Sequence, residues 1–147
     1  MLQIRRIKPE DIQFVIELAE ENNCFKGKLL SNIENFLICE SEGLKCGCGC
    51  LVPSGAFGYM SWVMVKESHR RQKLGGAITK ALLNIADNMD IKEVYAAGIC
   101  GEFLSALGFL KCNDCKATAD IKKVLDLDHK DCYNVKLEGY FKPCSHK

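Results

Sequence analysis

Apolar residues recur along the chain at two spacings, which predict helices and strands respectively. A spacing of three and four residues marks a helix that begins at Pro9 and fades near Asn22. Proline suits that start because the first helical turn has no partner for an N–H. The same spacing over residues 74–88 predicts the clearest helix in the chain, and a shorter helix is expected around residues 29–33.

A spacing of two residues predicts strands. After a strand-like segment at residues 2–7, three strands in an antiparallel meander are expected at residues 36–39, around 46–50 and at 59–65. Beyond residue 90 the expected elements are a strand at 93–97, a helix at 101–106, a strand at 109–112, a helix at 119–125 and a strand near 133–137. Because no linker or repeat interrupts this order, residues 1–147 are expected to form a single domain of α/β (α+β) class.

Charge and apolar run length argue against several classes of protein. The 147 residues carry 20 Lys and Arg against 19 Asp and Glu, a formal net charge of +1, whereas nucleic-acid-binding domains usually have a large basic excess. No apolar run approaches the roughly 20 residues that cross a bilayer, and charges stand where a signal peptide would be apolar. We therefore expect a cytoplasmic protein that binds neither nucleic acid nor membrane.

Ten cysteines make the chain cysteine-rich, and reduced thiols are expected because no export signal is evident. Cys46, Cys48 and Cys50 alternate with glycines, so a regular strand would direct all three thiols to one face, about 6 to 7 Å apart. That separation is too large for one zinc ion, so these thiols are expected to pack as small apolar residues under a helix.

A second thiol group contains residue types that bind zinc, namely Cys112, Cys115, Cys132, Cys144 and His146. Its Cys-x-His spacing is shorter than usual, and we predict no metal site. A protein in which cysteines bind a metal or an arsenical stays an alternative function.

The segment most informative about chemistry runs from residue 62 to residue 83. An apolar strand ends at Val65, a loop dense in cations follows, and Gly75 and Gly76 open the long helix. The first turn of a helix leaves N–H groups unpaired, and the helix dipole favours an anion there. A pyrophosphate fits this arrangement, which leaves nucleotides, flavins and coenzyme A as candidates. Neither the P-loop pattern nor the glycine-rich dinucleotide pattern is present.

This segment resembles the acetyl-CoA-binding motif of the GNAT superfamily of N-acetyltransferases, in which a strand ending in Val and a short loop precede [R/Q]-x-x-G-x-[G/A]. Val65 takes the strand-end position and Arg70 the [R/Q] position. Gly75 then takes the last glycine, while Lys73 stands where the first glycine usually lies. A register two residues later, beginning at Gln72, matches the letters better. We prefer the earlier register because it keeps the loop at the family's usual length.

A second motif supports the resemblance, which covers about residues 1–115. Residues 103–109, Phe-Leu-Ser-Ala-Leu-Gly-Phe, are similar to the family's aromatic-Tyr-x-x-Leu-Gly-Phe ending. The resemblance implies a mixed, mostly antiparallel sheet flanked by helices, with parallel fourth and fifth strands that splay apart around acetyl-CoA. It also implies that pantetheine pairs with the strand end and that backbone amides hold the pyrophosphate. The implied coenzyme-binding residues are Val63, Met64, Val65, Arg70, Arg71, Gln72, Lys73, Leu74, Gly75 and Gly76.

The resemblance implies an acyltransferase in which a primary amine attacks the acetyl thioester directly. The family often supplies the acid as a Tyr and holds pantetheine with an Asn, but Leu104 and Ala97 stand at these positions, and the fourth strand has no Glu. Cys100, at the mouth of the proposed cleft, is the candidate proton donor.

The pattern is closest to the amino-acid and arsenic-resistance N-acetyltransferase branch, whose members tend to lack that Tyr. The acceptor is therefore expected to be an amine of a small molecule or an amino acid. A CoA-binding domain without catalysis is a further alternative, and a homodimer is compatible with the sequence.

Overall fold

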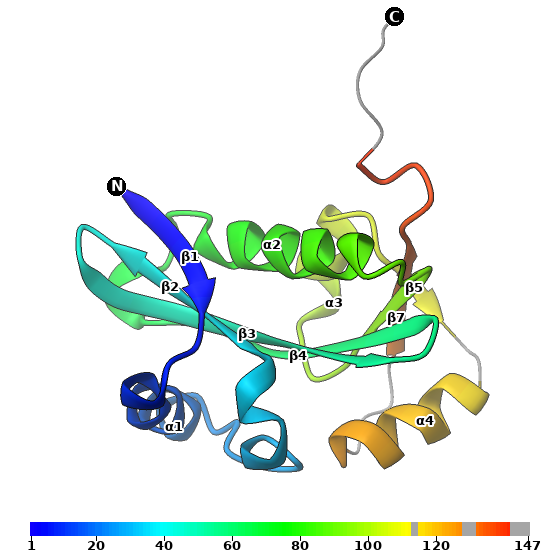
Figure 1. Ribbon diagram of the computed structural model, residues 1–147, viewed down its shortest axis with the longest axis horizontal. Helices are drawn as coiled ribbons and strands as arrows, with labels where there is room; N and C mark the ends of the chain where they lie inside the picture. The colour runs from blue at the N-terminus through cyan, green and yellow to red at the C-terminus, as the bar shows by residue number, and fades with distance from the viewer. Residues whose placement is uncertain (113–114, 128–131, 142–147) are drawn as a thin grey trace, which may run out of the picture.

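The computed structural model of the chain describes residues 1–112, 115–127 and 132–141, in which a seven-stranded sheet carries helices on both faces (Figure 1). The strands lie in the order β1-β2-β3-β4-β5-β7-β6. Their bounds are β1 Leu2–Arg6, β2 Phe36–Ser41, β3 Leu44–Ser54, β4 Phe57–Val65, β5 Glu93–Ala96, β6 Leu110–Cys112 and β7 Cys132–Lys136. The helices are α1 Ile12–Glu21, α2 Leu74–Asn88, α3 Gly101–Ala106 and α4 Cys115–Leu125, with 3-10 turns η1 Pro9–Asp11, η2 Leu30–Asn35 and η3 Glu67–His69.

Strand pairing confirms the expected mixed sheet. All described neighbouring strands pair antiparallel except β4 and β5, which run parallel from the Phe57–Glu93 pair to the Met60–Ala96 pair. Beyond that point β4 continues to Val65, whereas β5 ends. The two strands therefore separate on the side from which β4 leads into α2.

An irregularity in β4 lies where the two strands begin to separate. The register with β3 shifts, so that Cys48 pairs with Met64 but Cys50 pairs with Ser61. Trp62, within the shifted stretch, has a left-handed backbone with φ of 52°. A bulge of this kind bends a strand and increases its twist. The sequence pattern of β4 gave no sign of the bulge.

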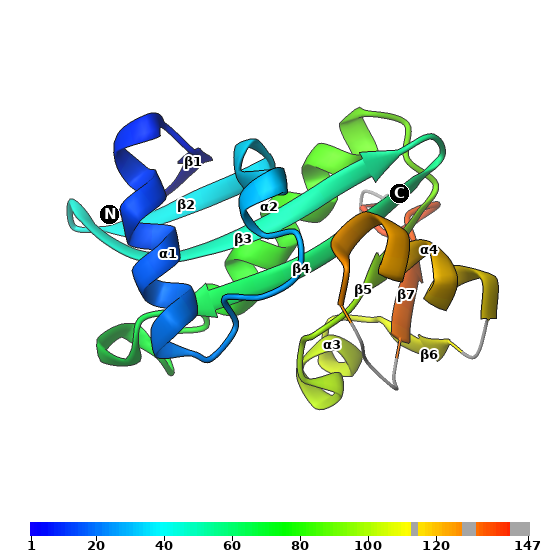
Figure 2. The same cartoon turned by 90° about the horizontal axis from the view of Figure 1, so that it is seen from below.

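Two buried clusters lie on opposite faces of the sheet. The cluster under α2 and α3 includes Ile78, Leu82 and Leu104, and Figure 1 shows α2 above the sheet. The cluster on the other face contains residues of α1 and α4, and Figure 2 shows both helices in front of the strands, α1 at the left and α4 at the right. Within the described ranges, no helix combines the length and the apolar character needed to cross a membrane.

Helix α2 packs on the face of β3 where Gly47 and Gly49 lie. A Cβ on Gly49 would lie 2.7 Å from Ile78 Cγ2 and 3.0 Å from Leu82 Cδ1. A Cβ on Gly47 would lie 3.0 Å from Ile78 Cδ1. Helix α2 therefore packs directly on the backbone of the alternating β3 glycines, and larger residues there would push the helix away from the sheet.

The expectation that three β3 thiols share one face is wrong. Cys48 and Cys50 lie in the cluster on the α1 face, but Cys46 lies in the α2-side cluster, with its Sγ 3.7 Å from Cys39 Sγ. The cause is a shift in the β2–β3 register between Cys39 and Glu40, which breaks the regular alternation of side chains.

Element bounds also differ from the sequence-based expectations. The short helix expected at residues 29–33 is the 3-10 segment η2, and the helix expected from residue 119 begins at Cys115. The first difference is one of helix type and the second lies at an element end, and the order of elements is as expected.

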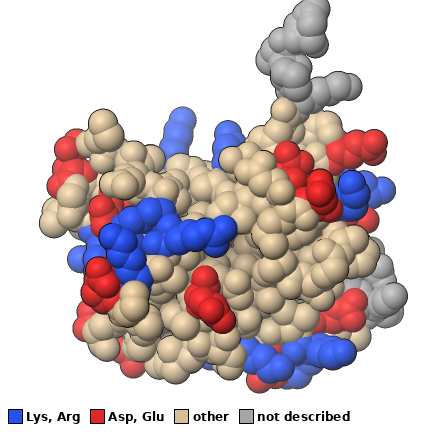
Figure 3. All heavy atoms as spheres, in the orientation of Figure 1, with Lys and Arg blue, Asp and Glu red and all other residues tan. Residues whose placement is uncertain are grey.

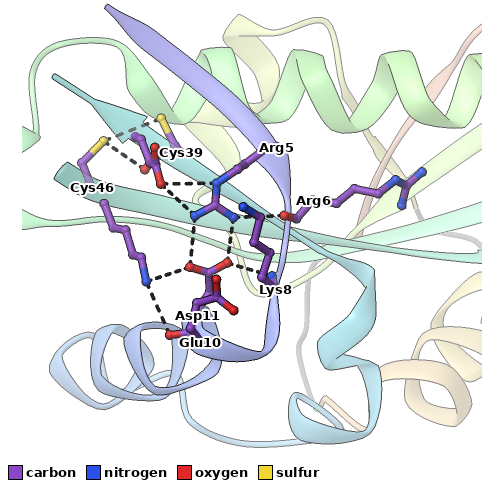
Figure 4. A network of polar contacts seen from close by, with 9 residues as sticks. Arg5, Arg6, Lys8, Glu10, Asp11, Cys39 and Cys46 are labelled. Atoms are coloured by element: carbon purple, nitrogen blue, oxygen red, sulfur yellow. Dashed lines mark hydrogen bonds and ion pairs between the residues drawn. The ribbon is translucent and has the colours of Figure 1, made fainter. Parts of the chain in front are cut away.

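A buried carboxylate joins the first strands to the start of α1 (Figure 4). Asp11 is fully buried and accepts hydrogen bonds from Arg5 at 2.7 and 3.1 Å, and from the Lys8 backbone N–H at 2.7 Å. Lys45 Nζ lies 2.7 Å from Asp11, and Arg5 also pairs with Glu40 at 2.7 Å. The hydrogen bonds from Arg5, with those from Lys45 and Lys8, hold the pKa of Asp11 well below its usual range. We call these residues the Asp11 network.

Candidate functional site

The loop between β4 and α2 has an unusual backbone. Arg71 has φ of 74° and Lys73 has φ of 60°, both in the left-handed region that residues with a Cβ rarely adopt. Strained conformations of this kind concentrate at ligand-binding sites. Lys73 is also the residue that aligns with the first glycine of the coenzyme motif. A left-handed backbone is what glycine favours, so this geometry fits the register that begins at Arg70.

Backbone donors gather where this loop enters α2. The first backbone hydrogen bond of the helix runs from the Ala77 N–H to the Lys73 carbonyl at 3.2 Å. The N–H groups of Leu74, Gly75 and Gly76 precede it, so they have no acceptor within the helix. Because the dipole of this long helix adds partial positive charge at the same turn, the turn is suited to bind an anion.

The cationic side chains of the loop divide into two kinds. Arg71 and Lys73 are exposed beside the helix start, as is Gln72. Arg70 instead donates from Nε to the Val65 carbonyl at 3.1 Å and from Nη2 to Asn22 Oδ1 at 2.7 Å. Arg70 therefore ties the end of β4 to the end of α1, and its guanidinium is engaged by protein groups.

A groove of about 680 Å³ runs between α2 and α3, next to this turn. It shares Lys73 and Gly76 with the loop and helix start, and Lys80 and Phe103 also line it. A Cβ on Gly75 would lie 3.3 Å from the Phe103 ring, so glycine allows α3 to pack against the first turn of α2. A ligand whose pyrophosphate binds at the turn could therefore extend into the groove with an adjoining part.

The gap between β4 and β5 offers unused backbone groups on the same side of the site. The last contacts between the strands are the Ala97 N–H bond to the Met60 carbonyl at 3.1 Å and the Ser61 Oγ bond to the Ala97 carbonyl at 2.7 Å. In the described part of the chain, no strand pairs with residues 63–65 on the β5 side. The edge of β4 that carries Val63, Met64 and Val65 can therefore bind an amide-containing arm, apart from the Val65 carbonyl, which accepts from Arg70.

Three residues singled out from the sequence lie in the segment after β5 or in the helix that follows it. Cys100 is exposed and immediately precedes α3, whereas Leu104 is fully buried in the cluster under α2. Ala97 is buried at the end of β5. Leu104 thus belongs to the core and offers no proton to a ligand, while Cys100 is exposed in the segment that leads from β5 into α3.

The structure also places a tyrosine that the sequence did not single out beside Cys100. Tyr133 lies on β7, opposite Ala96, and its ring packs against Gly101 at the start of α3. Strand β7 follows α4 in the chain but lies between β5 and β6 in the sheet. A tyrosine in the last strand was visible in the sequence, but its neighbours depended on that strand order.

The opposite face of the gap contains a buried donor without a partner. Trp62 packs against Phe36 with ring centroids 6.1 Å apart, and its Nε1 finds no hydrogen-bond acceptor among the described residues. On the same face, burial and the neighbouring Asp120 raise the pKa of Tyr59. This face therefore carries polar groups close to the point where the two strands separate.

Metal ligation has no support among the described residues, since no group of three or more His, Cys, Asp or Glu side chains is arranged to hold an ion there. Cys112 and Cys132 face each other across β6 and β7. The side chains of Cys115, Cys144 and His146 lie outside the described part of the structure. Figure 3 shows basic and acidic side chains mixed on the face turned to the viewer.

Comparison with known proteins identifies the family. Residues 3–113 match the model of the acetyltransferase (GNAT) family, so the chain belongs to that family, whose members transfer the acetyl group of acetyl-CoA. No curated protein matched the chain.

Solved structures share the fold at low sequence identity. N-acetylglutamate synthase from Neisseria gonorrhoeae, complexed with coenzyme A and N-acetyl-glutamate, superposes with a TM-score of 0.78 at 18% identity. The match covers 93% of this chain and 35% of that chain, so this chain spans about a third of that enzyme. Rv2747 from Mycobacterium tuberculosis, in complex with CoA and NLQ, gives 0.74 at 19% identity over 91% and 98% of the two chains. The ribosomal-protein-S18-alanine N-acetyltransferase from Escherichia coli gives 0.71 at 13% over 93% and 94%.

Proposed function

We propose that the protein is an acetyl-CoA-dependent N-acyltransferase that acylates a primary amine of a small molecule or an amino acid. The observation that carries the proposal is the first turn of α2, whose amides have no acceptor within the helix and which adjoins the groove between α2 and α3 at Lys73 and Gly76. Membership of the GNAT family supports the same reaction.

The residues of the site fit the parts of the coenzyme. The amides of Leu74, Gly75 and Gly76 would hold the pyrophosphate, with the charges of Arg71 and Lys73 beside it. The edge of β4 at residues 63–65, which has no pairing with β5, would pair with the amides of pantetheine. Bound in this way, the coenzyme supplies an activated acetyl thioester at the point where β4 and β5 separate.

The acceptor amine would approach from the face that carries α1 and α4, because the coenzyme occupies the face of α2 and α3. On that side the loop after α1 closes against the end of α4, where the Lys28 N–H and Nζ donate to the carbonyls of Leu125 and Lys123, each at 2.8 Å. The N-acetyl-glutamate bound to the Neisseria gonorrhoeae enzyme supports an amino acid as acceptor.

Calorimetry with CoA and acetyl-CoA tests the proposal first, followed by detection of free CoA thiol during incubation with a panel of amines and amino acids. We expect saturable binding of both coenzymes and thiol release with at least one amine. A wild-type protein that binds neither coenzyme would refute the proposal. The charge-reversed loop variant Arg71→Glu/Lys73→Glu is the matched negative control.

Two alternatives give different results in the same experiments. A CoA-binding domain without catalysis, which the buried Leu104 favours, would bind acetyl-CoA but release thiol with no amine of the panel. A cysteine-based metal or arsenical protein would retain metal through purification and show no heat with CoA. The homodimer and the cytoplasmic location stay predictions, which sedimentation and cell fractionation would check.

A further inference from the structure

Tyr133 points toward the face of the sheet on which the coenzyme would lie. It pairs with Ala96, the last residue of β5, and packs against the cluster beneath α2 and α3. The next residue, Asn134, faces the other way, since its Nδ2 donates to Glu93 Oε2 at 2.9 Å. The alternation of side chains along β7 therefore fixes Tyr133 on the α2 side, one strand away from the gap.

The Tyr133 hydroxyl reaches the start of α3. A Cβ on Gly101 would overlap the Tyr133 hydroxyl oxygen and come within 2.7 Å of Tyr133 Cζ. Only a residue without a side chain leaves room for the phenol at this point. Gly101 directly follows Cys100, so the hydroxyl lies beside the chain that leads from β5 into α3.

The hydroxyl of Tyr133 is available to a ligand. It makes no hydrogen bond within the described part of the chain, and Tyr133 itself is half-buried. Tyr140 is a useful contrast, because its hydroxyl donates to the Leu107 carbonyl at 2.7 Å. The Tyr140 hydroxyl therefore serves packing around α3, whereas the Tyr133 hydroxyl, at the start of α3, is left with an unused donor.

We propose that the Tyr133 hydroxyl donates the proton that the CoA thiolate takes up when the acetyl group leaves, an inference that rests on the proposed acetyltransferase function. The amine nitrogen forms a bond to the thioester carbonyl carbon and the carbon–sulfur bond breaks. The sulfur accepts the Tyr133 proton, the attacking nitrogen, which becomes positively charged on addition, loses one proton to water to leave the neutral amide, and solvent reprotonates the tyrosinate. Donor and acceptor are thus balanced without a further reactant.

Of the residues near Tyr133, one is excluded by its chemistry and one competes for the same role. Leu104 has no proton to give and is enclosed by the core. Cys100 is exposed before α3 and is the donor expected from the sequence, so it is the direct competitor. Cys100 directly precedes Gly101, against which the Tyr133 hydroxyl lies, so the two donors are neighbours that substitution can tell apart.

The test uses CoA itself, so it does not depend on knowing the amine. The ultraviolet absorbance of the thiolate is followed against pH for CoA bound to the wild type, Tyr133→Phe, Cys100→Ala and Tyr140→Phe. A donor to the thiolate lowers the pKa of the bound thiol. We expect that midpoint to rise by about one pH unit in Tyr133→Phe, a tenfold change in the ionisation equilibrium, and to stay at the wild-type value in the other variants.

Binding of desulfo-CoA, which lacks the thiol, checks that each variant keeps an intact site. Equal affinities for this probe together with an unchanged thiol midpoint in Tyr133→Phe would overturn the assignment, and a shift confined to Cys100→Ala would transfer it to Cys100. A wild type that binds neither probe would instead refute the acetyltransferase proposal. With an active amine from the panel, kcat of Tyr133→Phe should fall by about 100-fold while KM for both substrates is unchanged, and Tyr140→Phe should keep the wild-type kcat.

Discussion

Polar groups are paired within the protein in one half of the sheet and are exposed to solvent in the other. In the half formed by β1, β2 and β3, which we call the closed half, Asp11 is buried and satisfied by Arg5, Lys45 and Lys8. In the half around the separated ends of β4 and β5, which we call the open half, cations and amides face outward at the start of α2. The paired charges stabilise the scaffold, whereas the exposed cations and amides at the start of α2 form the candidate binding site.

Cysteine reactivity should show the largest contrast between the halves. Cys39, Cys46, Cys48 and Cys50 are fully buried, and burial raises the pKa of Cys39 to about 12. Cys100, in the open half, is exposed. We expect Cys100 to be alkylated at least about 100-fold faster than these four at about pH 8, as measured by pulse labelling and peptide mass spectrometry.

Saturating CoA should slow the labelling of Cys100 and leave the four buried thiols unchanged. Comparable labelling rates for Cys100 and Cys48 would contradict the division into a closed and an open half.

Removal of the Asp11 charge should give the next largest effect. Asp11→Asn removes the carboxylate that Arg5 and Lys45 share, although Arg5 keeps its pair with Glu40. We expect the free energy of unfolding to fall by about 3 kcal/mol, at the low end for a buried pair because both cations are partly exposed. Urea denaturation measures this change, and the CoA affinity of the folded variant should match the wild type. Glu42→Gln, which breaks an exposed pair with the N-terminus, is the control and should leave stability unchanged.

The same network predicts the response to acid. The pKa of Asp11 is lower in the folded protein than its unfolded value of about 3.9, so its stabilisation is complete above that pH and is lost as pH falls below it. Wild-type stability should therefore decline more steeply below about pH 4 than that of Asp11→Asn. Parallel stability curves for the two proteins over this range would rule out the assigned role.

Charge reversal in the open half should act on binding and spare folding. Arg71→Glu/Lys73→Glu places two carboxylates beside the proposed pyrophosphate, and we expect CoA affinity to fall about 30-fold in calorimetry at low salt. The loss should shrink as ionic strength rises. Lys92→Glu, a surface change at the other end of β5, is the control with unchanged affinity.

The smallest effect is expected from relief of backbone strain at Lys73. Lys73→Gly removes the Cβ from a left-handed residue, and the free energy of unfolding should rise by about 0.5 to 1 kcal/mol after the greater freedom of the unfolded chain is subtracted. Lys73→Ala keeps the strain and should show no gain in thermal unfolding. An equal gain in both variants would show that charge, not backbone conformation, is responsible.

The sequence predicted the fold well because its signals are local. The period of Ile78 and Leu82 located α2, and alternation located β3 and β4. The same periodicity could not reveal the register shifts at Cys39 and at Cys48, since a bulge depends on which residues lie opposite on the neighbouring strand. For that reason Cys46 was placed on the wrong face.

For the candidate site, too, the sequence predicted the local motif but not the residues that long-range strand order brings near it. The loop and the glycines of α2 form a contiguous motif, so residues 70–76 could be found from letters alone. Tyr133 could not, because its place beside Gly101 depends on β7 lying between β5 and β6. The engagement of Arg70 by Asn22 also joins residues that are distant in the sequence.

Gly47 and Gly49 have a consequence for how coenzyme affinity can be tuned. Ile78 and Leu82 touch the bare backbone of β3, and α2 carries the phosphate-binding turn at its first residues. The distance between that turn and the strands therefore depends on Gly47 and Gly49, which would not contact the coenzyme. A methyl group added at Gly47 or Gly49 would therefore be expected to displace α2 and to change the affinity for the coenzyme without contacting it.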